Sequence, residues 1–190
     1  MDEARRFYRN AEEWMAIAER LKQTPCPHCK GVGALVLHGF LRGYDESSPR
    51  QKTVRARRIF CSNRYARSGC GRTFSVWLDD KIRRLRLTAD ALWQFLQLAV
   101  ATCILAASRD INCRLSARTW QRIWQRFHRA QSTIRTALCG RRPPPESPPR
   151  SPTKPWRLAA AQVLAHLQAV FPDVHCPIAA FQHSMQTFFV

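Results

Sequence analysis

Acidic side chains are scarce in this sequence of 190 residues. Asp and Glu together number 13, against 31 Lys and Arg, which gives a formal net charge of +18. The imbalance is strongest in the segment 25–87, where fourteen basic residues accompany four acidic ones. A positive field concentrated in this way attracts a polyanion, most simply a nucleic acid. The alternative interpretation is a solvated basic surface without a dedicated partner.

The shortage of carboxylates also limits the chemistry that the chain can perform. Cutting and joining DNA with two metal ions requires carboxylates gathered around the scissile phosphate. After residue 78 the only acidic residues are Asp79, Asp80, Asp90, Asp110, Glu146 and Asp173. The sequence has no tyrosine after Tyr65 and no His-x-His pair. We therefore expect that the protein is not an enzyme.

Long apolar runs are missing as well. The most apolar stretch, 91–107, is interrupted by Gln94, Gln97 and Thr102 and is short for a bilayer span. The N-terminal residues contain no apolar signal core. We expect a cytoplasmic, nucleoid-associated protein with no membrane partner, in which the eight cysteines are reduced thiols or metal ligands.

Four of the cysteines stand in two pairs that suit a metal ion. Two residues separate Cys26 from Cys29, and eight separate Cys61 from Cys70. Thiolates are soft ligands that hold Zn²⁺ tetrahedrally, and a short spacing lets one turn present two sulfurs. The second spacing is longer than the usual two residues, so we expect the extra residues to form a loop. The sequence therefore predicts a four-thiolate zinc site.

Two histidines near these pairs are the alternative metal ligands. His28 lies within the first cysteine pair, and His38 follows it by nine residues. If one cysteine does not bind the ion, either imidazole is a chemically suitable replacement.

Periodicity and composition divide the chain into five segments. The predicted fold is mainly α with a small β zinc ribbon, whose sheet is too small to fold without a metal ion. The segments, in order, are an N-terminal amphipathic helix (1–24), a zinc-ribbon-like finger (25–78), a helical helix-turn-helix-like domain (79–140), a proline-rich linker (141–155) and a short C-terminal helical tail (156–190).

Helix boundaries follow from capping residues and apolar spacing. Residues 2–23 are predicted to form one helix capped by Asp2. A second helix is predicted over 89–107, with Cys103 as a small core residue inside it. Ser116 is a good cap for a further helix that ends near residue 138.

The helix that starts at Ser116 combines an apolar stripe with a row of four arginines, Arg118, Arg122, Arg126 and Arg129, here called the basic row. Like charges at this spacing repel one another, and a bound anion removes the repulsion. A capped helix with Arg and Gln in its first turns suits the DNA major groove. The alternative is an ordinary helix whose tryptophans simply pack, which leaves the basic row unexplained.

These considerations give a set of candidate nucleic-acid contacts. The predicted base-reading residues are Arg118, Gln121 and Arg122. The predicted phosphate contacts are Arg114, Arg126 and Arg129. Further basic candidates lie on a predicted strand and in a charged connector: Arg55, Arg57, Arg58, Arg83 and Arg84.

Three short motifs together resemble those of a known protein family. They are Cys-Pro-x-Cys at 26–29, Cys-Gly-Arg-Thr-Phe-Ser at 70–75 and Leu-Ser-x-Arg-Thr-Trp-x-Arg at 115–122. This arrangement resembles the N-terminal zinc-finger and helix-turn-helix region of bacterial insertion-sequence transposases, over roughly residues 25–130. The resemblance implies binding to element-end DNA with the four cysteines as metal ligands. The long second cysteine spacing departs from the family pattern.

Two functional hypotheses follow. The first is a non-catalytic, zinc-dependent DNA-binding protein of a mobile genetic element, acting as a regulator at an operator or as the targeting subunit of a separate catalytic transposase chain. A homodimer through the N-terminal helix is a further possibility for this protein. The second hypothesis is a structural adaptor in a larger nucleoprotein assembly, which follows a DNA or RNA backbone without reading bases.

Overall fold

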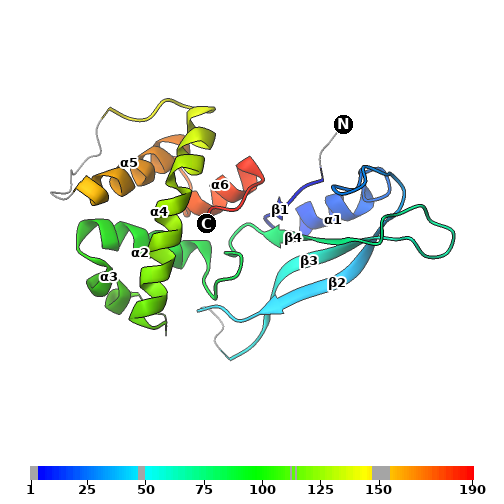
Figure 1. Cartoon of the computed structure of the whole chain (residues 1–190), viewed down its shortest axis with the longest axis horizontal. Helices are drawn as coiled ribbons and strands as arrows, with labels where there is room; N and C mark the ends of the chain where they lie inside the picture. Colours follow the sequence, from blue (N-terminus) through cyan, green and yellow to red (C-terminus); the bar gives the residue numbers. More distant parts are fainter. Residues whose placement is uncertain (1–3, 47–49, 112, 114, 147–154) are drawn as a thin grey trace. The chain divides into compact units, whose positions relative to one another are not determined.

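The computed structural model describes residues 4–46, 50–111, 113, 115–146 and 155–190. The chain forms two compact units, Met1–Lys81 and Ile82–Val190, here called unit 1 and unit 2. Among the described residues, unit 1 contains a small sheet and one helix, and unit 2 contains five helices (Figure 1). The fold is therefore mainly α with a small sheet, as the sequence predicts.

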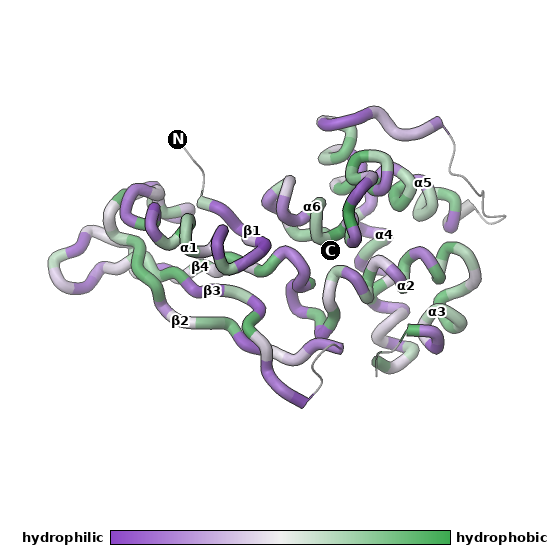
Figure 2. Tube along the Cα trace, turned by 180° about the vertical axis from the view of Figure 1, so that it is seen from behind, coloured by the Kyte–Doolittle hydropathy of each residue, from purple (hydrophilic) through white to green (hydrophobic). Residues whose placement is uncertain are grey.

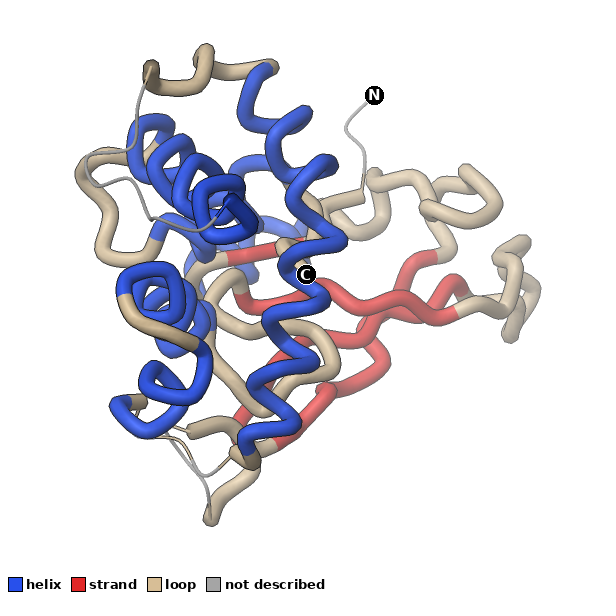
Figure 3. The backbone as a smooth tube through the Cα atoms, turned by 60° about the vertical axis from the view of Figure 1, so that its left-hand side comes forward, coloured by secondary structure: helices blue, strands red, loops and turns tan. Residues whose placement is uncertain are grey.

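Unit 1 is built on a four-stranded sheet in the order β1-β4-β3-β2 (Figure 3, red). Strands β2, β3 and β4 pair antiparallel in succession, and β1 pairs parallel with β4. Their bounds are Phe7–Tyr8 for β1, Leu35–Gly43 for β2, Thr53–Cys61 for β3 and Thr73–Leu78 for β4. The predicted short strands in the finger segment are thus present.

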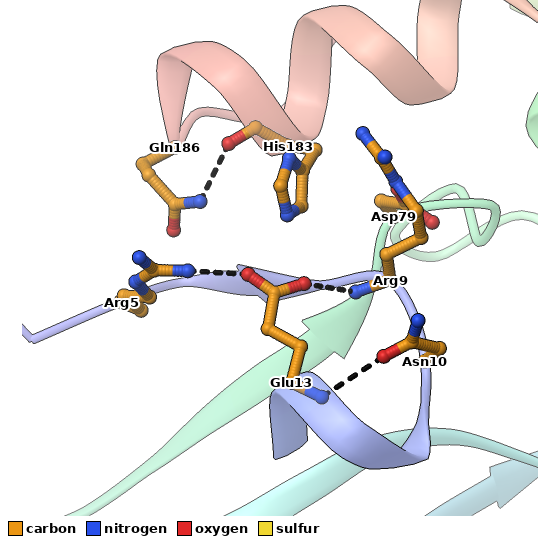
Figure 4. A network of polar contacts seen from close by, with 7 residues as sticks. All are labelled: Arg5, Arg9, Asn10, Glu13, Asp79, His183 and Gln186. Carbon is orange, nitrogen blue, oxygen red and sulfur yellow. Dashed lines mark hydrogen bonds and ion pairs between the residues drawn. The ribbon is translucent and has the colours of Figure 1, made fainter. Parts of the chain in front are cut away.

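The only helix of the described part of unit 1, α1, begins later than predicted. It spans Ala11–Glu19, and its cap is Asn10 rather than Asp2. The Asn10 side chain accepts the Glu13 N–H at 2.9 Å, while the Glu13 carboxylate accepts the Arg9 N–H at 2.8 Å and an ion pair from Arg5 (Figure 4). This reciprocal arrangement satisfies free donors at the start of the helix. The prediction of one helix over 2–23 was wrong, because Phe7 and Tyr8 pair with β4.

A small apolar core holds unit 1 together. Trp14 of α1 and Leu21 pack with Leu35, Ile59 and Val76 from three different strands. Cys26 and Cys61 are fully buried members of the same cluster. The segment preceding the first cysteine pair therefore belongs to the same compact unit as the sheet.

Unit 2 contains helices α2 to α6. Their bounds are Ala89–Ala101 for α2, Ile104–Asp110 for α3, Ala117–Cys139 for α4, Pro155–Val170 for α5 and Pro177–Met185 for α6. Figure 2 shows apolar residues recurring along these helices. A single apolar cluster collects the buried side chains of all five.

The predicted helix 89–107 is two helices. Thr102 leaves the helical conformation, and its hydroxyl donates a hydrogen bond to the Leu98 carbonyl at 2.7 Å. Cys103 then caps α3, with its Sγ accepting the Ala106 N–H at 3.4 Å. The prediction that Cys103 lies inside a continuous helix was therefore wrong. The apolar stretch is also too short for a bilayer, and no helix in the described ranges has the length and apolarity of a membrane span.

Helix α4 begins where the sequence predicts. The Ser116 hydroxyl accepts the Thr119 N–H at 3.2 Å, which is an N-cap bond. Its apolar stripe is buried, and Trp120 stacks on Phe95 of α2 with ring centroids 4.3 Å apart.

The C-terminal tail is part of unit 2. Leu167 of α5, Phe181 of α6 and Phe189 are all buried in its core. Residues 147–154 of the predicted proline-rich linker lie outside the described residues, and α5 begins at Pro155.

Candidate metal centre and basic surfaces

The four predicted metal ligands lie together in unit 1. The Sγ atoms of Cys26, Cys29, Cys61 and Cys70 are all within 4.8 Å of one another. Two of the separations, Cys26 to Cys70 and Cys29 to Cys61, are 3.8 Å. All four are free thiols, and these distances far exceed the length of about 2.05 Å of a disulfide bond. Four sulfurs that converge in this way form a possible metal site.

Two backbone turns with the same hydrogen bonds present the sulfurs. In the first turn, the Cys26 N–H donates to the Gly31 carbonyl and the Lys30 N–H to the Cys26 carbonyl, both at 2.9 Å. In the second, the Cys61 N–H donates to the Arg72 carbonyl and the Gly71 N–H to the Cys61 carbonyl, again at 2.9 Å. The two turns thus share one backbone pattern, although their cysteine spacings differ.

The backbone after each second cysteine is left-handed. Lys30, directly after Cys29, has φ 62°, and Gly71, directly after Cys70, has φ 72°. Backbone amides also point at the sulfurs: His28 N–H lies 3.4 Å from Cys26 Sγ, and Cys70 N–H lies 3.3 Å from Cys61 Sγ. Amide donors of this kind stabilise thiolates, because hydrogen bonds to the charged form favour it.

The residues Ser62–Gly69, here called the insertion loop, form a closed loop within the second turn. Its first and last residues lie next to each other. The Gly69 N–H donates to the Ser62 carbonyl at 3.0 Å, which closes the base of the loop. A Cβ on Gly69 would lie 2.2 Å from the Ser62 carbonyl oxygen and 2.8 Å from the carbonyl carbon of Cys61. Only glycine fits this close approach of two backbone segments. The long spacing is therefore accommodated as a closed loop, as predicted.

Burial and hydrogen bonding shift the pKa values of Cys29 and Cys61 in opposite directions. A backbone hydrogen bond from Gly31 lowers the pKa of the exposed Cys29 to about 7. Burial raises the pKa of Cys61 to about 12. Of these two thiols, Cys29, at the solvent side of the cluster, therefore loses its proton more readily than Cys61. A divalent ion is then needed to bring all four sulfurs into the thiolate form.

The alternative histidine ligands lie elsewhere. The His28 ring packs against Phe74 with centroids 6.3 Å apart, and the His38 ring against Phe60 at 5.4 Å. The metal-competent group found among the described residues contains the four cysteines alone.

The basic row of α4 lies mainly in solvent. Arg118, Arg122 and Arg129 are exposed, as is the candidate base reader Gln121. Arg126 is half-buried; burial, followed by the nearby charge of Arg84, lowers its pKa. The sequence of α4 contains no acidic residue that would neutralise the row within the helix.

The remaining basic candidates of unit 2 are divided. Arg84 is exposed and adopts a left-handed backbone conformation with φ 62°. The guanidinium of Arg83 lies over the Phe188 ring at 4.9 Å. Arg114 lies outside the described residues.

Three of the predicted nucleic-acid contacts, Arg55, Arg57 and Arg58, lie on β3, and the first two make contacts within unit 1. Arg55 is only 6% exposed and donates to the Tyr44 carbonyl at 2.7 Å. The guanidinium of Arg57 lies between Trp14 and Phe40, at 5.2 and 4.5 Å from their ring centroids. Only Arg58 is exposed, on the opposite face of β3 because side chains alternate along a strand.

One exposed aromatic residue was not among the predicted site residues. Tyr65, in the insertion loop, is 92% exposed, and Arg64 and Arg67 are exposed beside it. The only signal in the sequence was the unusual length of the second cysteine spacing.

Comparisons with protein-family models, curated proteins and solved structures found no match to this chain. The resemblance to transposase regions therefore stays a prediction that rests on the three short motifs.

Proposed function

We propose that this chain is a non-catalytic, zinc-dependent DNA-binding protein of a mobile genetic element, which reads DNA with α4. In this proposal it targets or regulates a separate catalytic transposase chain. The proposal is carried by one observation: three of the four arginines of the basic row are exposed on α4, while the apolar stripe on the opposite side of this helix is buried in the core of unit 2.

Zinc is the metal that fits the cysteine cluster best. Four thiolates around Zn²⁺ at about 2.3 Å form a tetrahedron with edges of about 3.8 Å. The separations between Cys26 and Cys70 and between Cys29 and Cys61 equal this edge. Two turns with matching backbone hydrogen bonds are the geometry by which two ligand pairs share one ion. The ion would have a structural role, since all four positions around it are taken by protein sulfurs.

The arrangement of α3 and α4 supports a helix-turn-helix interpretation. The two helices are joined by the short connection 111–116, and α4 starts at a capped serine. Arg118, Gln121 and Arg122 occupy the first two turns, which is where a recognition helix contacts base edges. Because none of the four arginines of the basic row forms an ion pair within the described part of the chain, their charges are available to an anion.

The adaptor hypothesis has less support. It assigns partner binding to the N-terminal helix and the C-terminal tail. However, Trp14 of α1 and both Phe181 and Phe189 of the tail are buried in the cores of their own units. These three aromatic side chains are thus not available to a partner.

A mobility-shift titration across salt concentrations tests the proposal. We expect preference for one DNA sequence and an affinity that falls steeply with salt, because phosphate contacts release counterions. The variant Arg118→Ala/Arg122→Ala should weaken binding to the preferred site and relax its sequence preference, at about 1–3 kcal/mol for each base contact.

A charge-matched variant in unit 1, Arg20→Ala/Lys22→Ala, is the control. Both of its side chains are exposed, and it removes the same net charge from the protein. We expect it to keep the sequence preference. Equal loss in both variants, or equal affinity of the wild type for random and selected DNA, would contradict sequence reading by α4.

A further inference from the structure

The insertion loop is a well-anchored structure whose tip faces solvent. Its base is closed by the Gly69–Ser62 hydrogen bond, and the Ser62 N–H donates to the Ala34 carbonyl at 2.8 Å. The Arg64 N–H lies 3.3 Å from the Ser62 hydroxyl. Metal binding would fix both ends, because Cys61 and Cys70 flank the loop directly. In Figure 1 this connection between β3 and β4 projects past the end of the sheet.

The tip of the insertion loop presents an aromatic ring without a covering neighbour. Tyr65 is 92% exposed, and both Tyr65 and Ala66 are left-handed, with φ of 53° and 59°. L-residues other than Asn and Asp rarely adopt this conformation, and such strained positions cluster at functional sites. A tight turn, in which the Arg67 N–H donates to the Arg64 carbonyl at 3.2 Å, holds the tip in shape.

The surroundings of the ring are basic. Arg64, Arg67 and Arg72 are exposed, and the Arg64 guanidinium also lies over the Phe60 ring at 5.8 Å. The sequence contains no carboxylate between Glu46 and Asp79, so nothing in this stretch neutralises the arginines. An anionic partner that also offers a flat ring would satisfy both features of the loop.

We propose that the insertion loop binds unpaired nucleotides of a DNA strand, with Tyr65 stacked on a base and Arg64 and Arg67 against the flanking phosphates. Stacking on aromatic side chains combined with a positive surface is how proteins hold single strands. A duplex fits less well, because its bases are already stacked on one another. A lipid surface also fits less well, because the other loop residues are small or polar and offer little apolar area.

This interaction is separate from the proposed reading of duplex DNA by α4, and the two can be tested in parallel. The probes are a twenty-nucleotide oligothymidine and a duplex containing the preferred site. Tyr65→Ala should weaken binding to the single strand by about tenfold, the effect of losing one stacked base. Binding of that variant to the duplex should stay within about twofold of wild type, since the loop does not contact paired bases in this proposal.

The variant Tyr65→Phe is the matched control, because it keeps the ring and removes only the hydroxyl. It should bind the single strand as the wild type does. Since Tyr65 is almost fully exposed, neither substitution should alter folding, which circular dichroism can verify. Photocrosslinking to an oligonucleotide with a halogenated uracil should place the crosslink on Tyr65 itself.

Three outcomes would overturn the proposal. One is unchanged single-strand affinity of Tyr65→Ala, and another is an equal loss for Tyr65→Ala and Tyr65→Phe. The third is Tyr65-dependent binding to oligouridine RNA with none to oligothymidine, which would assign the loop to RNA. If Arg118→Ala/Arg122→Ala loses the duplex while single-strand binding is independent of Tyr65, the loop proposal fails and the α4 proposal stands. If instead duplex binding is unchanged in Arg118→Ala/Arg122→Ala while single-strand binding depends on Tyr65, the α4 proposal fails and the loop proposal stands.

Discussion

The two units reach stability by different means. In unit 2, twenty-four buried apolar side chains among the described residues form one cluster that draws on all five helices. In unit 1 the corresponding cluster has nine members, and two of these are the metal-ligand candidates Cys26 and Cys61. A small sheet cannot bury enough apolar surface to offset its loss of conformational entropy. Unit 1 therefore depends on polar and ionic links where unit 2 depends on packing.

Ion pairs show the same contrast. Lys81 of unit 1 is buried and contacts Asp45 at 2.8 Å and Asp80 at 3.0 Å. The side chain of Asp45 has no exposed surface. In unit 2 the imidazole of His175, whose side chain is 88% exposed, lies 3.6 Å from a carboxylate oxygen of Asp90. Exposed pairs of this kind contribute little to stability.

Metal removal should produce the largest difference in stability between the two units. A structural zinc site contributes roughly 10–16 kcal/mol of apparent binding free energy, which exceeds the stability of a domain this small. Chelation, or Cys61→Ser, should abolish hydrogen-exchange protection of β2, β3 and β4 and leave that of α2 and α4 unchanged. Cys139→Ser, which removes an exposed cysteine of unit 2, is the control. Loss of protection in both units together would contradict the contrast.

The apolar counterpart of this experiment is Trp120→Ala. Trp120 is completely buried against Phe95, so truncation should lower the free energy of unfolding of unit 2 by about 3–5 kcal/mol. Metal affinity, measured by competition with a chromogenic chelator, should stay the same. Trp120→Phe should cost much less, because it keeps most of the volume and removes an indole N–H that has no hydrogen-bond partner. An equal cost for both variants would show that packing is not the cause.

The buried ion pair of unit 1 gives a third test. Lys81→Ala removes the ammonium group that lies 2.8 Å from the buried Asp45 carboxylate and should destabilise unit 1 by about 3–5 kcal/mol. The double variant Asp45→Leu/Lys81→Met removes both charges and should cost considerably less. Denaturant unfolding of the metal-loaded protein, followed by exchange in β3, measures both. If the double variant were as unstable as the single one, an unpaired charge would not be the reason.

The same pair predicts a dependence on pH. Burial alone would lower the pKa of Lys81, but the hydrogen bond to Asp45 and the charge of Asp80 outweigh it and raise the pKa above its ordinary value of 10.5. A raised folded-state pKa means that this stabilisation is complete below the ordinary value and is lost as the pH rises through the folded-state value. Stability of the wild type should therefore fall in this alkaline range, and that of Asp45→Leu/Lys81→Met should fall less.

The smallest effect is expected at Gly69. A methyl group there meets backbone atoms, which cannot move aside as a side chain can, and overpacking of this kind costs about 1–3 kcal/mol. Gly69→Ala should thus weaken metal binding through the second turn, as measured by chelator competition. Ser68→Ala, a change at an exposed neighbour, should not. Unchanged affinity of Gly69→Ala would mean that the base of the loop tolerates displacement.

Local patterns in the sequence were sufficient to predict the four candidate metal ligands and the start of α4. Cysteine spacing reports ligand geometry because the ligands of each pair lie close in the chain, and the Ser116 cap acts on an amide three residues away. The spacing within each cysteine pair and the cap of α4 depend on neighbours in sequence, whereas the meeting of the two pairs joins residues that are 32 and 44 positions apart. The local features can therefore be predicted without knowledge of the tertiary structure.

Features that depend on distant partners were not predicted. Residues Phe7 and Tyr8 leave the expected helix because they pair with Trp77 and Leu78, about seventy residues away. From the sequence, Arg55 is expected to be a surface cation. However, a Cβ on Gly43 would lie only 2.8 Å from the Arg55 Cδ, so the aliphatic part of the Arg55 side chain passes over this glycine of the paired strand. Which residues face each other across a sheet is set by strand register, which composition does not report.

The closed base of the insertion loop has a consequence for the covalent continuity of the chain. A protease that cuts after Arg67 would leave Cys70 on one fragment and Cys61 on the other. Four sulfurs on a shared ion and the ladder between β3 and β4 would still hold the fragments side by side. The protein could then be split at this point, and its two pieces would reassemble only when the ion is supplied.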